Sequence, residues 1–278
     1  MTDTQAFLGR LDAHWAAHLG CTTRQLRDGK RHVVVRPSDA DDTPPPWPLR
    51  RGPVALVTTG TGWVLSVPAG MAERANALCT GLTFAQQVAD GDRASQRWFD
   101  GGAHDNPHMQ RPKSDAAYLV MNELMSGFPL RGWSHYVLSY ANVEMDQTPS
   151  DPHVLRLTPD HPSAWGQFQK WPGPMCGPHI SKHFPVSDAF GYMLDDKLVS
   201  VAQLEARPEE LEWEYGVDTL PEYRVRGFAT AVLKTVTAHI AEQGHVPWHY
   251  TDHYNRPSRR LPVKLGYLLY GEGLFSAT

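Results

Sequence analysis

Apolar residues recur at helical spacing in the stretch that follows residue 228. The helix is predicted from five positions that would form one stripe, and these are Ala229, Val232, Leu233, Val236 and Ile240. Gly244 is a typical stop for this helix. The segment 211–219 before it has the pattern of a strand. The loop between the two, Arg224–Ala229, therefore delivers its backbone N–H groups at a helix N-terminus.

The same patterns predict an alternating order of elements beyond residue 151. The predicted elements are strands at 154–157, 190–194, 198–206 and 246–251, a helix at 163–171, a helix after Asn255 and a final strand. Asp195, Asp196 and Lys197 form a tight turn between two of the strands. This order predicts an α/β fold with a mixed, mostly antiparallel sheet and helices packed on its faces.

The N-terminal half has fewer clear patterns. Strands at 54–59 and 63–67 flank Gly60-Thr61-Gly62, which we interpret as a hairpin turn, with a helix at 69–79 behind them. The segments 118–125 and 135–141 are each a helix or a strand, and prolines make 43–48 a stiff connection. Turn formers at 147–152 predict a boundary between an N-terminal α/β domain, 1–150, and a second domain, 151–278.

Composition and charge narrow the class of protein. Of the 278 residues 41% are hydrophobic, enough for real cores, and a net charge of −4 gives no basic surface for nucleic acid. No apolar run is long enough for a bilayer, and residues 1–20 lack the order of a secretory signal, so we expect a cytoplasmic protein with no membrane partner. Three scattered cysteines do not describe a disulfide framework. The sequence does not indicate an oligomeric state.

The fourteen histidines raise the question of a metal site. His179 and His183 have the spacing of two ligands on one helical face. Pro178 and Pro185 flank the pair, however, and no carboxylate stands in the expected register. We therefore expect no metal.

The loop Arg224–Ala229 has two interpretations from its residues alone. The unpaired N–H groups and the dipole of the following helix favour an anion, and Gly227 allows a phosphate to approach closely. The alternative is an ordinary connection whose arginines are solvated, because a short glycine motif is weak evidence.

The sequence around the loop resembles the GNAT superfamily of acetyl-CoA-dependent N-acetyltransferases. The family's loop reads Gln/Arg-x-x-Gly-x-Gly/Ala, and Arg224, Gly227 and Ala229 match it. The segment 217–223 is similar to the family's approach to that loop. The family's last helix is matched by Asn255, Ser258, Leu261, Lys264, Leu265, Gly266 and Tyr267. The resemblance covers roughly residues 152–278, and the first domain could be a degenerate copy of the same fold.

The resemblance implies how acetyl-CoA would be held as a co-substrate. Val217 and Thr219 would pair with the pantetheine arm, and the Val217 N–H would donate to the oxyanion. Asn255 and Ser258 would contact the pantetheine or the ribose. The pyrophosphate would lie on the loop, which includes Arg224 and Phe228. It would contact the backbone amides of Val225, Arg226, Gly227, Ala229 and Thr230.

The resemblance also implies an acyl transfer to an amine acceptor, which needs a base. The family often has a glutamate on the strand before the loop, at a position that falls beside Trp213. Glu214 is our first candidate, with Glu212 and with Glu205 on the neighbouring strand as others. A regular strand sends Glu212 and Glu214 to the face opposite Trp213, whereas a bulge would re-aim one of them. The alternative is that both are solvent-facing strand residues.

The family's proton donor is missing from the matched helix. Many members have a tyrosine where this chain has Pro262, which supplies no proton. Tyr254, His253 or Ser258 would take this role, or the thiolate would leave unaided. The sequence thus predicts an N-acyltransferase acting on a primary amine of a small molecule or peptide, in a ternary complex. The alternative is an inactive, regulatory protein that binds acyl-CoA.

Overall fold

The computed structural model describes residues 3–37, 52–60, 62–79, 132–142, 151–179, 186–205, 210–253 and 255–277. The chain divides into two compact units. The first unit contains Met1–Leu138, Tyr250–Arg259 and Leu269–Thr278, and the second contains Ser139–His249 and Arg260–Leu268. The domain boundary near residue 150 stays a prediction. The predicted segments 43–48 and 118–125 lie outside the described residues.

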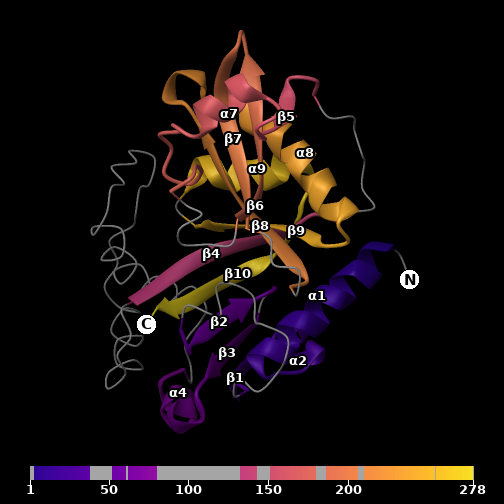
Figure 1. The fold of residues 1–278 in the computed structure, drawn as a ribbon. Coiled ribbons are helices and arrows are strands. Elements are labelled where there is room, and N and C mark those ends of the chain that lie inside the picture. Colours follow the sequence, from indigo (N-terminus) through magenta and orange to yellow (C-terminus); the bar gives the residue numbers. More distant parts are fainter. Residues whose placement is uncertain are drawn as a thin grey trace. The chain divides into compact units, whose positions relative to one another are not determined.

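The first unit contains a twisted set of strands in the order β1-β3-β2-β10-β4, followed by the end of β9 (Figure 1). The strands are β1 (Arg31–Val35), β2 (Ala55–Thr58), β3 (Trp63–Val67), β4 (Gly132–Tyr140), β9 (Val246–Asp252) and β10 (Leu268–Ala277). β2 and β3 are antiparallel neighbours, which confirms the predicted hairpin. β1 pairs with β3 in parallel, and β10 is antiparallel to β2.

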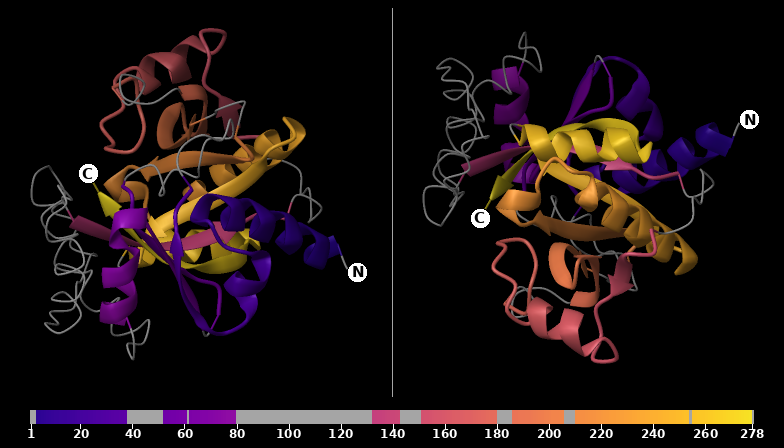
Figure 2. Two further views of the ribbon diagram at one scale, coloured as in Figure 1. Left: turned by 90° about the horizontal axis from the view of Figure 1, so that it is seen from below. Right: turned by 90° about the horizontal axis from the view of Figure 1, so that it is seen from above.

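Helices α1 (Asp3–Leu19) and α2 (Thr23–Arg27) lie beside these strands in the views of Figures 1 and 2. The sequence analysis did not predict α1, although Phe7, Leu11 and Trp15 recur every four residues and are buried. The Trp15 ring lies 6.1 Å from that of Tyr270 and 6.2 Å from that of Phe275. The predicted helix at 69–79 is present as a short 3-10 turn, η1 (Ala69–Met71), and α4 (Ala72–Cys79).

The second unit contains strands in the order β9-β8-β7-β6-β5. They include β5 (Val154–Arg156), β6 (Val186–Leu194), β7 (Lys197–Glu205) and β8 (Glu212–Thr219). Neighbours from β5 to β8 are antiparallel, whereas β8 and β9 are parallel, so the predicted mixed and mostly antiparallel sheet is confirmed. Asp195 and Asp196 have φ values of 48° and 61°, as the two-residue turn between β6 and β7 requires.

Helices pack on both faces of this second set of strands. On one face α8 (Phe228–Glu242) buries four members of the predicted apolar stripe against Trp213 and Tyr215 of β8, whereas the fifth, Ala229, is half-buried. On the other face α7 (Pro162–Phe168) packs Ala164 and Phe168 against β6 and β7. A further helix, α9 (Arg256–Leu265), and a 3-10 turn, η3 (Pro221–Tyr223), flank the loop region. The helix order predicted for residues 151–278 is thus confirmed.

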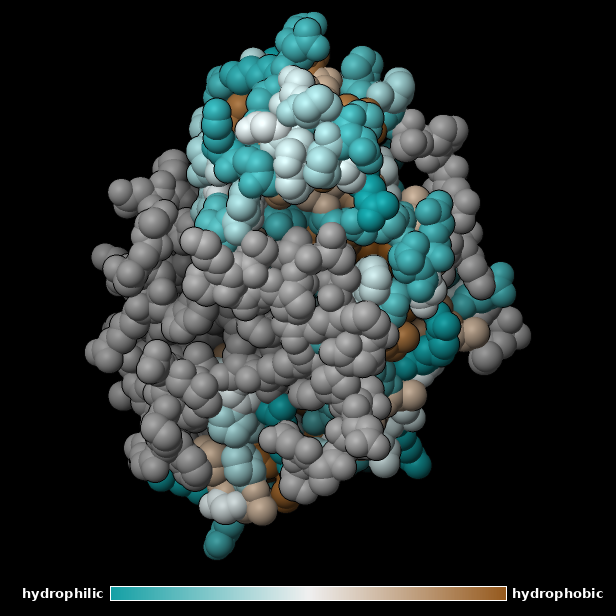
Figure 3. Space-filling view, viewed as in Figure 1, coloured by the Kyte–Doolittle hydropathy of each residue, from teal (hydrophilic) through white to brown (hydrophobic). Residues whose placement is uncertain are grey.

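Among the described helices, none combines the length and the apolar character that a membrane span requires. The face shown in Figure 3 carries mostly hydrophilic residues over the β6–β7 hairpin at the top of the view. The cytoplasmic location stays a prediction.

Candidate functional site

The N-terminus of α8 has the geometry of an anion-binding site. Its cap residue is Gly227, with a φ of 93°, and no side chain caps the helix. The first intrahelical bond runs from the Ala231 N–H to the Gly227 carbonyl at 3.0 Å. The N–H groups of Phe228, Ala229 and Thr230 precede that bond, so they and the positive end of the helix dipole can hold a negative group.

Gly227 is required here by its backbone conformation. A φ of 93° lies in the left-handed region that favours glycine, and a Cβ built at this position would meet nothing within 4 Å. The space in front of the glycine is therefore open. Val225, two residues earlier, also has a positive φ of 63°, and its side chain is fully exposed.

A pocket of about 850 Å³ opens beside this helix end. Its size is typical of sites for a small molecule or a cofactor. Its walls are formed by Asp151, Pro152, His153, Tyr192, Gly227, Thr230, Ala231, Lys234 and Lys264. Two ammonium groups thus join the helix N-terminus in one pocket, and all of these residues belong to the second unit.

The sequence analysis did not single out Lys234 as a site residue. Gly227, Ala231 and Lys234 are spaced four and three positions apart, which places them on one helical face. That spacing was available from the sequence. His153 and Tyr192, by contrast, come from separate segments, and their stacked rings lie 5.5 Å apart at an angle of 18°.

The two arginines of the loop are engaged with the loop itself. The Arg224 Nε donates to the Thr219 carbonyl at 3.2 Å. The Arg226 guanidinium lies over the rings of Tyr223 and Phe228, 5.5 and 5.1 Å from their centroids. These contacts hold the path of the loop from β8 into α8.

Strand β8 has backbone N–H groups that point away from its neighbour β7. The Leu220 N–H donates to the Val199 carbonyl at 3.0 Å, and successive N–H groups of a strand point to opposite edges. Alternation directs the N–H groups of Val217 and Thr219 away from β7. The described ladder with β9 joins Glu212 to Val246 and Trp213 to Pro247, and β8 continues beyond it to Thr219.

The three candidate glutamates lie near the start of β8. Glu212 is buried and accepts from the Tyr140 hydroxyl at 3.4 Å, while Glu214 stands opposite Glu205 in the β7–β8 ladder. The register from Glu214 to Thr219 has no shift. Because Trp213 and Tyr215 pack on α8, Glu212 and Glu214 project from the other face.

A half-buried carboxylate near Val217 was missed from the sequence. Asp218 accepts from the Met175 N–H at 2.8 Å, and burial raises the pKa of its carboxyl against the lowering effect of that donor. Residues 171–177 pack closely against β8, because a Cβ on Gly216 would stand 2.5 Å from the Met175 carbonyl oxygen. A Cβ on Gly173 would stand 2.3 Å from Asp218. Residues 171–177 therefore cover the face of β8 beside Val217.

The residues matched to the last helix have structural contacts. The Asn255 side chain accepts from the Ser258 N–H at 3.3 Å, which makes Asn255 the N-cap of α9. Pro262 is buried inside α9. Tyr254 and His183 lie outside the described residues.

Tyr267 belongs to a buried chain of hydroxyl groups. The Tyr215 hydroxyl donates to that of Tyr267 at 3.1 Å. The Tyr267 hydroxyl lies 2.6 Å from the Thr237 hydroxyl, which donates to the Leu233 carbonyl at 2.7 Å. Burial raises the pKa of Tyr267 to about 12, so this tyrosine stays protonated and serves the core.

Comparison with known proteins agrees with this architecture. Residues 210–276 match the family model described as FR47-like protein, a match that covers less than half of the chain. The resemblance of the C-terminal half to the GNAT superfamily is confirmed at the level of fold. No curated protein matches the chain.

Several solved structures share a limited similarity with the chain. A putative GNAT-family acetyltransferase from Novosphingobium aromaticivorans is 21% identical, over 68% of this chain and 96% of that one, with a TM-score of 0.43. A GCN5-related N-acetyltransferase-like protein from Streptococcus suis is 17% identical, over 58% and 68%, with a TM-score of 0.41. A GCN5-related N-acetyltransferase from Kribbella flavida is 18% identical, over 58% and 62%, with a TM-score of 0.38. These similarities are too low to carry functional information.

Proposed function

We propose that this protein is an N-acyltransferase that moves an acetyl group from acetyl-CoA to a primary amine of a small molecule or peptide. The observation that carries the proposal is the N-terminus of α8, which opens without a capping side chain onto a pocket that contains Lys234 and Lys264. Backbone donors, a helix dipole and two cations together suit a ligand with several phosphates.

CoA would use three parts of the pocket. The pyrophosphate would lie on the amides from Val225 to Thr230, where the left-handed Gly227 keeps the approach open. Lys234 and Lys264 would neutralise the remaining phosphate charge. The stacked rings of His153 and Tyr192 would supply a flat wall for the nucleoside end.

The reaction would take place along the edge of β8. The pantetheine arm would pair with the N–H groups at Val217 and Thr219, and the thioester carbonyl would face the Val217 N–H. The amine nitrogen attacks that carbonyl in a ternary complex, and the N–H stabilises the oxyanion. The C–S bond then breaks, an amide forms, and CoA leaves as a thiolate that takes up a proton.

The amine must lose a proton in the same reaction. We assign this role to Glu214, acting directly or through water, with Glu205 opposite it and Glu212 beside it as the other candidates. Glu214 lies three residues before Val217, a distance of about 10 Å along a strand, so its side chain and a short chain of bound waters would together have to carry the proton. Tyr254 stays a prediction for the proton donor, and Asn255 and Ser258 stay predictions for CoA contacts.

A second candidate function is a regulatory protein that binds acyl-CoA without turning it over. The observation in its favour is Pro262, which is buried inside α9 where many GNAT members have a proton-donating tyrosine. The substitutions Glu205→Gln, Glu212→Gln and Glu214→Gln would leave the acyl-CoA binding of such a protein unchanged.

The test separates binding from turnover. CoA binding to the full chain is measured by calorimetry, and CoA release is followed by a thiol assay across a broad panel of primary amines. The enzyme predicts release that depends on the amine and that falls at least tenfold in Glu214→Gln with CoA affinity unchanged. Tight binding with no release by any amine would support the regulatory protein. Absence of CoA binding would reject both functions.

A further inference from the structure

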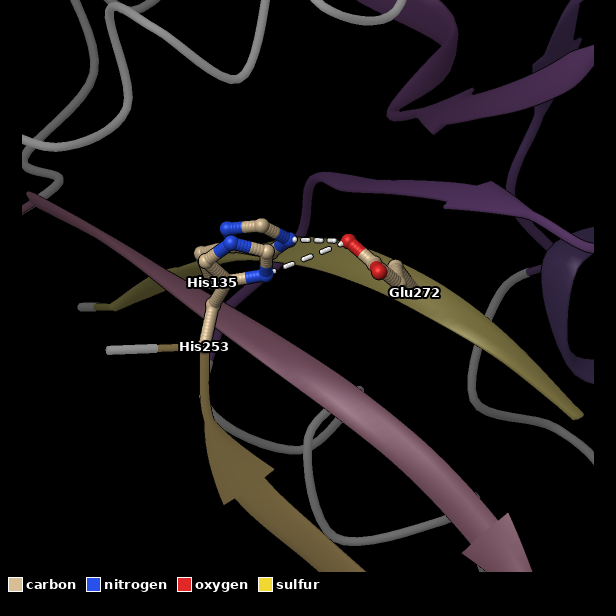
Figure 4. A group of neighbouring side chains, drawn as sticks. All are labelled: His135, His253 and Glu272. Carbon is tan, nitrogen blue, oxygen red and sulfur yellow. Dashed lines mark hydrogen bonds and ion pairs between the residues drawn. The ribbon is translucent and has the colours of Figure 1, made fainter. Parts of the chain in front are cut away.

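Three side chains from different parts of the sequence meet in the first unit. His135 lies in β4, His253 directly follows β9, and Glu272 lies in β10, 137 positions after His135. The three strands are neighbours in the order β10-β4-β9. Figure 4 shows both imidazoles directed at the carboxylate of Glu272. We call this group the histidine cluster.

Both imidazoles approach the same carboxylate oxygen. The His135 Nε2 lies 2.9 Å from the Glu272 Oε2, and the His253 Nδ1 lies 3.3 Å from it. The two rings stack with centroids 4.0 Å apart and an angle of 14° between their planes. The three donor atoms all lie within 4.8 Å of one another.

These separations suit a shared metal ion. Ligands that surround Zn²⁺ at 2.0–2.2 Å in a tetrahedron stand roughly 3.3 Å apart. An ion would lie among the three atoms once the stacked rings turn so that both nitrogen lone pairs point at it, and it would take the place of the protons between nitrogen and oxygen. Without an ion, the same contacts form a hydrogen-bonded cluster, and the experiment below decides between the two states.

The donor set also points to the kind of ion. Two imidazoles and one carboxylate favour a transition metal such as Zn²⁺ over Mg²⁺ or Ca²⁺, which prefer oxygen ligands. The His135 side chain is 2% exposed, whereas those of His253 and Glu272 are 27% and 28% exposed. His135 is thus held in the core, and an ion can reach the cluster from the solvent past His253 and Glu272.

We propose that His135, His253 and Glu272 form a binding site for one divalent transition metal ion of the Zn²⁺ class. The three protein ligands leave at least one coordination position for water or another ligand. The ion would link β4, the end of β9 and β10. These strands are neighbours in the sheet and do not follow one another in the sequence. Metal binding at the cluster can be measured without acyl transfer.

The test uses the full chain, freed of any affinity tag and of metal, and titrates it with Co²⁺ and Zn²⁺ alone. We expect one equivalent of Co²⁺ to give visible ligand-field absorption that Zn²⁺ displaces, and Zn²⁺ to raise the unfolding temperature. Affinity should fall at least tenfold in His253→Ala and in Glu272→Gln. His32→Ala is the matched control, because His32 also lies in the first unit with its Nε2 3.0 Å from the Asp28 carboxylate.

Two results would overturn the proposal. One is a wild-type protein that shows neither the absorption nor the shift in unfolding temperature. The other is a set of folded variants, checked by circular dichroism, in which His253→Ala and Glu272→Gln bind with wild-type affinity. Should the variants fail to fold, the wild-type absorption and temperature shift decide the question alone.

Discussion

The loop before α8 and the histidine cluster both offer a place for a ligand, and they do so with different parts of the chain. The loop, Arg224–Ala229, and the first turn of α8 use consecutive backbone N–H groups and a helix dipole. The cluster uses side chains from β4, from β10 and from the residue that follows β9, held by their packing in the first unit. A ligand at the loop depends on the path of the backbone, and one at the cluster depends on each side chain.

This difference predicts different responses to substitution. Most side chains of the loop can change while its amides stay in place, except where the left-handed backbone demands glycine. Each member of the cluster, by contrast, supplies a donor atom that no neighbour replaces. The following experiments test this contrast, beginning with the largest expected effect.

Gly227→Asp should weaken CoA binding at least 100-fold. The new side chain enters the open space before the α8 N-terminus and brings a negative charge to a site for phosphates. Calorimetry with CoA measures the loss.

Gly244→Asp provides the matched control for this substitution. Gly244 lies beyond the other end of α8 with a φ of 83°, and a Cβ there also meets nothing within 4 Å. It should carry a similar backbone strain of about 1–2 kcal/mol and keep CoA affinity. An equal loss of CoA binding in both variants would mean that strain, and not the site, explains the effect.

Lys234→Ala should weaken CoA binding about tenfold, because one ammonium group of the pocket is lost while the loop amides remain. Lys170→Ala, at an exposed lysine of the same unit, should leave the affinity unchanged. If Lys234→Ala bound CoA as tightly as wild type, the phosphates would have to lie elsewhere.

Glu272→Ala should lower the free energy of unfolding by about 2 kcal/mol in the presence of a chelator. The substitution removes the acceptor of the buried His135. Urea denaturation measures the change. Glu222→Ala breaks an exposed ion pair with Lys197 and should leave the midpoint unchanged. A stable Glu272→Ala protein would show that the cluster does not depend on this carboxylate.

Arg226→Ala should have the smallest effect, a roughly threefold weaker affinity for CoA, because the cation–π contacts with Tyr223 and Phe228 brace the loop without forming its donors. The calorimetric titration is the same as for Gly227→Asp. A loss as large as that of Gly227→Asp would show that side chains dominate the loop after all.

The loop uses consecutive residues, whereas the histidine cluster uses residues that are far apart in the sequence. This difference decides how much of each could be predicted from the sequence. The stripe of Val232, Leu233 and Val236 and the glycine at 227 lie within one stretch of sequence, so local spacing predicted strand, loop and helix correctly. The position of Lys264 beside Gly227 was not predicted, because it depends on how α9 packs against α8.

The histidine cluster had no signal in the sequence. Glu272 lies 137 positions after His135, and such a separation matches no short spacing pattern of metal ligands. The sequence analysis accordingly considered His179 and His183, which are close in sequence, and expected no metal. Helix α1, by contrast, has a local signal in the sequence, the repeat of Phe7, Leu11 and Trp15, although the helix was not predicted.

Val225 shows what the shape of the loop demands of the protein. A β-branched residue with a φ of 63° is strained by about 1–3 kcal/mol, and its fully exposed side chain gains no packing in return. The position is therefore a natural target for engineering, where asparagine or glycine would fit the same backbone more easily. A protein selected for heat tolerance alone would be expected to replace this valine early, whereas one selected for its ligand can keep it.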